Sequence, residues 1–589
     1  MIADQQRAAN ISESEILAHV ERITKSRIFA GSPRLCRFLT WTVQETMRSG
    51  GENIKQYVIG REVFDRREEF DPRADSIVRT EARRLRRKLR EYYELEGRSD
   101  AVQISFKPGS YVAHFKTRDE GPKLQQKQAI AVLPFENLTA SPDLEYFCRG
   151  MTESIQARLA SSAGLKVISS LSAFRFEADS DPATIASELG VTLIVQGGIR
   201  HASDRIRVHA KAVETASGSY LWAGVFDRKM SDIFAVEDEI ASSVAEAVVG
   251  RLSPHQRLRS IVVPSLEAYE LYLQGRQHWS KLSPEGCQQA LEYFTRAILL
   301  SPGYAAAYAA VADAYNWLIF FSTREPLDVI EPIKQSALRA IDLDPNCAEA
   351  YVALGSVAAV FESRWDEAER LFRQGLELRP SSVPAFIQRS FARLQTGDLE
   401  GARLDQEAAT ELDPLSPRCY RNAGFRLYLQ RDYDAALAAF GRALKLGPEV
   451  KHTHYFRGLA LLHAGRHNQA VEALLRSLND SECGLYMGAL VAAYAGSGRK
   501  RKAIQILRDL EELARNAFVS PIAFVHAYAG IGDLDRALDS LNRAAERRFL
   551  GLMQLKLEPL LDPLRNEGQF IAALEKLNLP RQAASAQGR

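Results

Sequence analysis

The segment DSIVRTEARRLRRKLREYY, residues 75–93, has one apolar side and is otherwise strongly basic. Its apolar residues recur at intervals of three and four, which predicts a helix whose buried stripe is Val78, Ala82, Leu85, Leu89 and Tyr92. Between Arg79 and Arg90 it holds seven basic residues and a single acid, Glu81. A solvated face usually mixes both signs of charge. The pattern therefore favours a helix that lies against phosphates, and a plain solvated face is the alternative.

The sequence on either side of this helix predicts further helices before it and a β-hairpin after it. Apolar residues recur with helical spacing in two earlier segments, about 12–50 and 54–64. Asp75 or Ser76 is a suitable N-cap for the basic helix. Beyond that helix, residues 102–115 alternate apolar and polar positions on both sides of Pro108-Gly109. The expected order is helices, a basic helix and a hairpin, which is the order of a winged-helix domain.

Two runs carry a resemblance to a known family, VRTEARRLRRKL and KPGSYV. They resemble the recognition helix and the glycine-tyrosine wing of the winged-helix DNA-binding domains of OmpR/PhoB-type response regulators and their membrane-bound CadC-like relatives. The resemblance covers roughly residues 50–116. It departs from the family where residues 12–50 look helical, because the family begins with a small antiparallel sheet. It implies a winged-helix DNA-binding domain over residues 1–118.

Double-stranded DNA is the partner that this resemblance implies. Residues 1–118 hold 23 Lys and Arg against 17 Asp and Glu, whereas the whole chain has a net charge of only +2. Arginine pairs with phosphates and can read guanine edges. Phosphate contacts supply most of the affinity, so few of these residues need to read bases. The expected DNA-binding residues, of which the last two lie at the hairpin tip, are Arg79, Thr80, Arg83, Arg84, Arg86, Arg87, Arg90, Lys107 and Ser110.

Several features predict a cytoplasmic protein without membrane contact. The polar run KTRDEGPKLQQKQ contains the expected linker, residues 119–128, at a junction where many relatives carry a membrane helix. The N-terminal stretch lacks the apolar run of a secretory signal. Six widely spaced cysteines, with no CxxC pair, are typical of reduced thiols. Winged helices of this type commonly bind tandem or two-fold sites, so the resemblance also implies a homodimer.

Residues 129–252 alternate strands and helices, which predicts one α/β domain with a mixed sheet. Tight turns are expected at Ser203-Asp204 and Ser217-Gly218. Gly197-Gly198 lacks the flanking residues of a phosphate loop, so we interpret it as a bulge or a close approach at an edge of the sheet. The run IAVLPFENLTASPDLEYFCRGMTESI resembles a TolB-like domain, and the resemblance covers nearly all of the region.

Residues 266–579 repeat a pattern in which a small residue is followed by a bulky one and then by another small one, as in Ala436, Phe440 and Ala443. The first small positions fall at 368, 402, 436, 470, 503 and 537. Their spacing of 33 or 34 residues is the tetratricopeptide period. About eight repeats and a C-terminal cap are expected, with about ten inserted residues around FSTREPLDVIEP. Such repeats form a superhelix whose groove takes a protein or peptide partner.

Neither a metal site nor an enzyme is expected. His463 and His467 are four residues apart, but Gly465 between them indicates a turn, and no acid or cysteine completes a ligand set with them or with His452 and His454. The chain contains no GxSxG or HExxH motif and no catalytic cysteine with a suitable partner. No cofactor is therefore expected. Chains that pair a TolB-like domain with repeats sometimes carry a class III nucleotide cyclase domain, but here the winged helix takes that N-terminal place.

The fold class that follows is multidomain, α/β plus all-α: an N-terminal winged helix, a central mixed-sheet domain and a C-terminal tetratricopeptide solenoid. The first functional hypothesis is a cytoplasmic transcriptional regulator whose TolB-like and repeat regions bind a partner or sense a signal. The second is a protein-interaction scaffold that does not bind DNA. The third is an enzyme with an unrecognised site in residues 129–252, which a perturbed acidic pair in a pocket there would favour.

Overall fold

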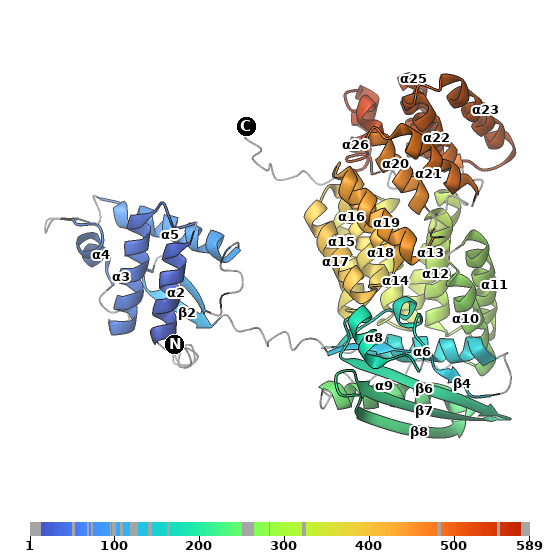
Figure 1. Cartoon of the computed structure of the whole chain (residues 1–589), viewed down its shortest axis with the longest axis horizontal. Helices are drawn as coiled ribbons and strands as arrows, with labels where there is room; N and C mark the ends of the chain where they lie inside the picture. The colour runs from blue at the N-terminus through green and yellow to red at the C-terminus, as the bar shows by residue number, and fades with distance from the viewer. Residues whose placement is uncertain are drawn as a thin grey trace. The chain divides into compact units, whose positions relative to one another are not determined.

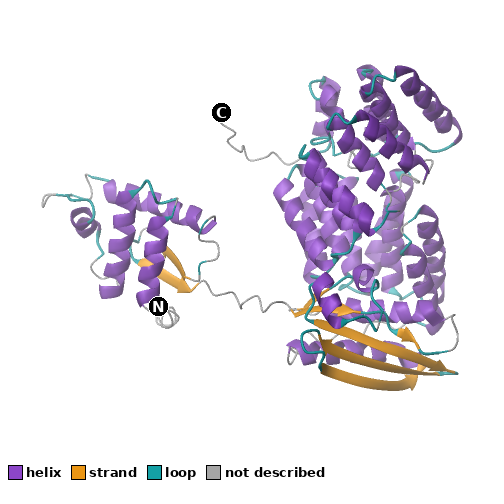
Figure 2. Ribbon diagram, in the orientation of Figure 1, coloured by secondary structure: helices purple, strands orange, loops and turns teal. Residues whose placement is uncertain are grey.

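A computed structural model of the chain describes most of its length (Figures 1 and 2). The described residues are 13–26, 28–49, 54–66, 70–71, 75–94, 96, 100, 102–106, 110–117, 128–139, 144–161, 165–177, 179–249, 264–281, 283–320, 325–448, 450, 452–479, 484–549 and 554–578. Contacts divide the chain into two compact units, residues 1–126 and 127–589.

The first unit consists, in its described part, of helices followed by a hairpin. Its elements are α2 (Glu13–Lys25), α3 (Pro33–Ser49), α4 (Gln56–Glu62), α5 (Ile77–Glu94), β1 (Val102–Phe106) and β2 (Ala113–Thr117). The backbone N–H of Ile77 donates to Asp75 Oδ1 over 2.9 Å. Of the two residues expected to cap the basic helix, Asp75 therefore accepts the capping bond. The strands are antiparallel, with Ile104 opposite Phe115. The expected turn at Pro108-Gly109 lies outside the described residues.

The apolar stripe of α5 is buried, as its spacing predicts. Val78 and Leu85 are each 1% exposed and Tyr92 is 2% exposed. They belong to one core with fully buried residues of the preceding helices and loop, among them Ile23, Phe29, Leu39 and Val43. Residues 13–49 thus form, in their described part, two helices joined by a short loop, in agreement with the helical spacing of the sequence. This core fixes which side of α5 faces outward.

A buried polar cluster joins α2 to α5 and to the start of the hairpin. Asp100 accepts a hydrogen bond from Tyr92 Oη over 2.6 Å and pairs with Arg22 over 2.8 Å. Tyr93 Oη lies 3.0 Å from His19 Nε2 and accepts from the backbone N–H of Ile104 over 2.8 Å. Burial lowers the pKa of His19. Buried polar groups need such partners, and the bonds made by Arg22 and His19 connect α2 to residues more than 70 positions later.

The second unit begins with a mixed sheet. Its strands are β3 (Gln128–Val132), β4 (Glu136–Asn137), β5 (Leu165–Val167), β6 (Leu193–Ala202), β7 (Arg205–Glu214) and β8 (Tyr220–Lys229). Their order is β5-β3-β6-β7-β8, with β4 also pairing with β6. The pairs among β3–β6 are parallel and those from β6 to β8 antiparallel, so the expected mixed sheet is confirmed.

The two glycines Gly197 and Gly198 lie inside β6, which has neighbours on both sides. Their pairing with β7 is regular, so the suggestion of a bulge or an edge position is wrong. The suggestion of a close approach is confirmed. A Cβ on Gly197 would lie 2.1 Å from the carbonyl oxygen of His209, and one on Gly198 would meet Leu138 at 2.6 Å. Glycine is needed there because the sheet leaves no room for a side chain.

Helices cover both faces of the sheet at β3. Alternate residues of β3 separate the two cores: Ile130 and Val132 face α6 (Glu145–Ala160) and α9 (Ile233–Val249). Ala129 and Ala131 share the opposite core with α7 (Ser170–Ala173) and α8 (Pro182–Leu189). This strand is apolar on both faces because both faces are buried.

In their described part, residues 266–546 form a stack of eight helix pairs. The helices are α10 (Leu266–Trp279), α11 (Pro284–Leu300), α12 (Ala305–Phe320), α13 (Pro326–Leu343), α14 (Ala348–Val360), α15 (Trp365–Leu378), α16 (Val383–Thr396), α17 (Leu399–Leu412), α18 (Pro417–Leu429), α19 (Tyr433–Leu446), α20 (Thr453–His463), α21 (His467–Asn479), α22 (Gly484–Gly496), α23 (Lys500–Asn516), α24 (Pro521–Ile531) and α25 (Leu534–Glu546).

The small–bulky–small pattern is the contact between the two helices of a pair. Ala436, Phe440 and Ala443 are fully buried in α19. Gly424 of α18 lies against Phe440 so closely that a Cβ there would sit 2.6 Å from the ring. The small residues let the helices approach, and the aromatic ring fills the space between them. The expected eight repeats are thus confirmed.

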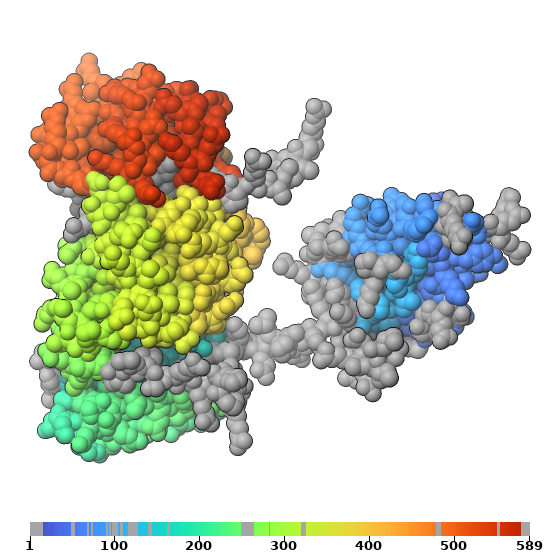
Figure 3. Space-filling model, turned by 180° about the vertical axis from the view of Figure 1, so that it is seen from behind, coloured from blue at the N-terminus to red at the C-terminus, as the bar shows by residue number. Residues whose placement is uncertain are grey.

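The sheet and the repeats pack together in one unit, along one edge of the stack (Figures 1 and 3). Ser172 Oγ donates to Asp413 Oδ1 over 2.5 Å, and the backbone N–H of Ser169 donates to the carbonyl oxygen of Leu412 over 2.8 Å. At the first repeat, Arg276 pairs with Glu153 over 3.2 Å. The sequence treats these regions as separate segments and gives no sign of this contact.

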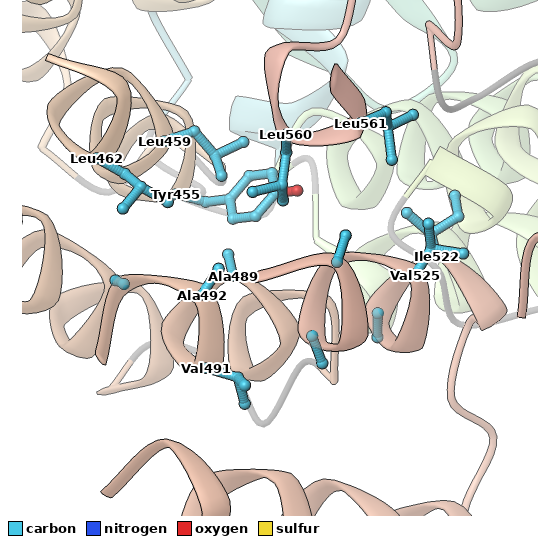
Figure 4. Close-up of a cluster of buried hydrophobic side chains, with 14 of the residues drawn as sticks. Tyr455, Leu459, Leu462, Ala489, Val491, Ala492, Ile522, Val525, Leu560 and Leu561 are labelled. Atoms are coloured by element: carbon cyan, nitrogen blue, oxygen red, sulfur yellow. The ribbon is translucent and has the colours of Figure 1, made fainter. Parts of the chain in front are cut away.

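The chain ends in a cap that folds back over earlier repeats. It contains the 3-10 helix η6 (Pro559–Leu564) and α26 (Gly568–Lys576). Leu560 and Leu561 pack with Tyr455, Val525 and neighbouring apolar residues of three repeat helices (Figure 4). Polar contacts reach further back: Trp365 Nε1 donates to the carbonyl oxygen of Leu577 over 2.9 Å.

Candidate nucleic-acid interface

The outward side of α5 carries most of its basic residues. Opposite the buried stripe, Arg79, Thr80, Arg83, Arg84 and Arg87 are all exposed. The structure thus brings these five expected DNA-binding residues onto the solvent side of one helix. For Arg90 only the backbone is described, and Lys107 lies outside the described residues.

Two of the expected arginines have partners within the unit. Arg84 pairs with Glu81 one turn earlier, over 3.0 Å. Arg86 is half-buried and donates from a terminal guanidinium nitrogen to the carbonyl oxygen of Ser110 over 2.9 Å. Arg86 therefore connects α5 to the hairpin, and its role is to hold these two elements together. Ser110 is also committed locally, because its Oγ accepts from the backbone N–H of Val112 over 3.2 Å.

Three arginines remain available on this surface. Arg79, Arg83 and Arg87 follow one another at intervals of four residues, so they form a row along the helix. Among the side chains that the structure describes, none lies within hydrogen-bonding or ion-pairing distance of these three. We call Arg79, Arg83 and Arg87 the arginine row. Such a row can place guanidinium groups along a phosphate backbone.

Lys88, which the sequence analysis leaves out of the DNA-binding set, turns back toward the core. Its Nζ donates to the carbonyl oxygen of Ile28 and lies 5.7 Å from the centre of the Phe29 ring. This contact fastens α5 to the loop between α2 and α3. The basic side chains of the helix that the structure describes are therefore divided between holding the fold together and facing solvent.

The histidines of the repeats do not converge. Gly465 adopts a left-handed backbone with φ of 73°, so it makes the expected turn between His463 and His467. His463 packs against the rings of Tyr428 and Tyr433, and burial lowers its pKa to about 4. His452 Nδ1 lies 3.0 Å from Tyr486 Oη instead. Within the described residues, no three His, Cys, Asp or Glu side chains are grouped as metal ligands.

A perturbed acidic pair does occur in the sheet region. Burial raises the pKa of Glu237 in α9 to about 7 and also raises that of its neighbour Asp238. Glu237 is 1% exposed, accepts from Tyr269 Oη over 2.5 Å and pairs with Arg158 over 3.2 Å. These contacts join α6, α9 and α10. Glu237 is enclosed between these elements, whereas the side chain of Asp238 is partly exposed.

Comparison with known proteins shows tetratricopeptide-type repeats. Residues 426–489 match the model of a tetratricopeptide repeat family. Among solved structures, a tetratricopeptide protein of Thermus thermophilus, TTC0263, aligns with a TM-score of 0.29 and 18% identity over 33% of this chain and 99% of its own. The residues matched by the family model lie within the helix pairs described above.

Two curated relatives are similar over part of their length. A putative adenylate cyclase 3 of Rhizobium meliloti is 32% identical over 253 residues, which is 42% of this chain and 43% of the relative. The transcriptional regulator HilA of Salmonella typhimurium is 25% identical over 190 residues, which is 32% of this chain and 33% of the relative. The matches thus span less than half of each relative. The chain is a repeat protein with weak similarity to regulators.

The described helices include none long and apolar enough to pass through a lipid bilayer.

Proposed function

We propose that this protein is a transcriptional regulator that binds double-stranded DNA through α5 and the hairpin, in the manner of a winged helix. The observation that carries the proposal is the arginine row on the outward side of a helix whose opposite side is fixed in a core. Arg86 supports it, because it holds the hairpin beside the helix. Similarity to HilA, whose name describes a transcriptional regulator, points in the same direction.

In this proposal the second unit binds the partner that regulates the protein. Tetratricopeptide repeats generally bind proteins, so the repeats would recruit or receive a protein or peptide partner. Self-association of the chain would place two α5 helices on a two-fold site. The N-terminal domain would comprise residues 1–118, followed by a linker at 119–128, a TolB-like domain at 129–252 and the repeats with their cap at 266–579. The cytoplasm is the compartment in which such a regulator would act.

The test is the salt dependence of DNA binding by the full-length protein. Affinity for a fluorescent duplex from the gene's own upstream region is measured at several salt concentrations. The variant Arg79→Ala/Arg83→Ala/Arg87→Ala should lower the slope of log affinity against log salt by about 0.9 for each phosphate that the protein no longer neutralises. A matched control, Arg403→Ala/Arg466→Ala/Arg476→Ala, removes three arginines that lie on the repeats.

The outcomes separate two hypotheses. A steep slope that flattens in the first variant and persists in the control supports DNA binding by α5. Absence of binding at low salt, or equal weakening in both variants, contradicts it. The protein would then be a repeat scaffold that does not bind DNA, the alternative that the eight helix pairs favour.

A further inference from the structure

A cavity lies inside the curve of the repeats. Its volume is about 150 Å³. In the described chain, its walls come from the first helices of seven successive pairs, beginning with α12 and ending with α24. Residues Gln554 and Glu558 of the C-terminal segment complete the lining. The cavity is therefore built by parts of the chain more than 200 residues apart.

The C-terminal segment closes part of the groove in which a repeat protein would accept an extended peptide. Lys556 Nζ donates to the carbonyl oxygen of Thr396 over 3.1 Å, and Arg548 donates to that of Phe361 over 2.9 Å. Tyr428 Oη donates to Glu558, which is 3% exposed. These contacts hold the segment across the inner helices.

The lining is rich in aromatic rings, and it also holds polar side chains such as Gln388, Gln395 and His452. Its rings include Trp317, Phe361, Phe391, Phe425 and Phe456. Such a wall favours a flat aromatic body, because rings stack edge to face or in offset layers. A predominantly apolar pocket with a small number of placed polar groups is typical of small-molecule sites.

Two polar groups give the cavity its chemical preference. The guanidinium of Arg421 is 3% exposed and holds Asn422 Oδ1 at 3.0 Å. Burial and the nearby Arg418 lower the pKa of Arg421 to about 9, so it remains a cation at neutral pH. The second group is Gln554 Oε1, a buried acceptor to which no described donor comes within hydrogen-bonding distance. Gln554 has a left-handed backbone with φ of 48°.

The other titratable groups of the lining are His452, Tyr455, His526 and Glu558. Burial lowers the pKa of His526 to about 4, so its ring is neutral at pH 7. Burial raises the pKa of Glu558 to about 7, and its carboxylate already accepts from Tyr428 and from the backbone N–H of Leu560. Arg421 is therefore a cation in the wall of the cavity, and an anionic occupant would interact favourably with it.

We propose that this cavity binds a small aromatic anion, with the ring stacked among the aromatic side chains, the anionic group on Arg421 and a hydrogen-bond donor on Gln554 Oε1. The occupant would contact both the inner helices and the C-terminal segment, so binding would stabilise the closed repeats. This inference does not depend on DNA binding, because every group it uses lies in the second unit.

The test uses two dyes and the full-length protein. One dye is 1-anilinonaphthalene-8-sulfonate, an aromatic anion, and the other is N-phenyl-1-naphthylamine, the uncharged molecule with the same rings. The variant Arg421→Gln should weaken the sulfonate dye about tenfold or more, because a charge-assisted hydrogen bond is removed, and leave the neutral dye almost unchanged. The control Arg476→Gln removes an exposed arginine of α21 and should change neither.

Two further measurements show where the dye binds. Trp317 lines the cavity, so Trp317→Phe should reduce energy transfer from tryptophan to the bound sulfonate dye. Ala392→Phe places a ring inside the cavity and should weaken both dyes, with the helical circular dichroism retained as evidence of folding. If Arg421→Gln destabilises the repeats, Ala392→Phe and Trp317→Phe still decide the location.

The outcomes are distinguishable from those of the DNA experiment. Selective weakening of the sulfonate dye in Arg421→Gln, with weakening of both dyes in Ala392→Phe, supports the proposal. Equal binding of both dyes that is indifferent to Arg421 would overturn the anionic assignment. Dye binding that is unaffected by Ala392→Phe and Trp317→Phe would place the dye elsewhere and overturn the site. Neither result bears on the arginine row of α5.

Discussion

The two units use arginine in opposite ways. On α5, Arg79, Arg83 and Arg87 are exposed and lie in a row along one helix. In the repeats, Arg421 is almost fully buried and faces a cavity whose walls come from many helices. The exposed row has little cost of desolvation and offers a surface to a large, highly charged partner. The buried arginine has a large cost, which a small, well-placed anion can offset.

This difference also separates residues that hold the fold from residues that face a partner. On α5, Arg86 and Lys88 bind carbonyl oxygens of neighbouring segments, while the arginine row does not. In the second unit, Glu237 joins the sheet region to the repeats by accepting from Tyr269 Oη. Charge alone therefore does not mark an interface, and the contacts of each side chain decide its role.

The largest expected effect is on the contact between paired repeat helices. Phe440→Ala removes a fully buried ring that fills the space beside Gly424. We expect a decrease of about 3–5 kcal/mol in the free energy of unfolding of the repeats. Urea unfolding followed by circular dichroism measures it. Leu299→Ala, at a side chain 74% exposed, is the matched control and should change little. Equal effects at the two sites would contradict the assigned packing.

The second effect concerns the pH dependence of the second unit. The pKa of Glu237 is raised to about 7, so the folded protein holds a proton that the unfolded chain releases near pH 4.5. Stability should therefore fall as pH rises from about 4.5 to 7, by about 3 kcal/mol for this group. Glu237→Gln should remove this part of the pH dependence. Urea midpoints of both proteins, measured from pH 5 to pH 8, test this expectation. The same pH dependence in both proteins would show that Glu237 is ionised throughout.

The third effect separates a positioning arginine from the arginine row. Arg86→Ala removes the bond to the carbonyl oxygen of Ser110 and should destabilise the hairpin by about 1–2 kcal/mol. Hydrogen exchange of the amides of β1 and β2, read by mass spectrometry, should accelerate about tenfold. The same measurement on Arg83→Ala is the control. Acceleration in Arg83→Ala and not in Arg86→Ala would reverse the two roles.

The smallest expected effect on stability is at the row itself. Arg83→Ala removes an exposed side chain that has no partner among the described residues. Its free energy of unfolding should stay within about 0.5 kcal/mol of the unchanged protein. If the row contacts phosphates, the salt slope of DNA binding should nevertheless fall by about 0.9. A change in stability without a change in slope would assign Arg83 to the fold instead.

Much of the fold could be predicted because its signals are local. The 34-residue spacing of small and bulky residues predicts the helix pairs, since each contact lies within a pair. The apolar stripe of α5 and the two-residue period of β1 follow from the geometry of single elements. The interpretation of Gly197-Gly198 was only partly correct, because pairing on both sides of β6 depends on strands from other parts of the chain.

The candidate sites also divide into features that the sequence predicts and features that depend on the tertiary structure. The sequence by itself determined the outward arginine row, because three residues at four-residue intervals share a side of any helix. Tertiary structure alone decided that Arg86 holds the hairpin and that Glu237 is enclosed, since their partners come from separate elements. It also decided the cavity, which exists because the C-terminal segment returns to helices more than 100 residues earlier. Periodicity in a sequence reports neighbours along an element, and only folding brings distant elements together.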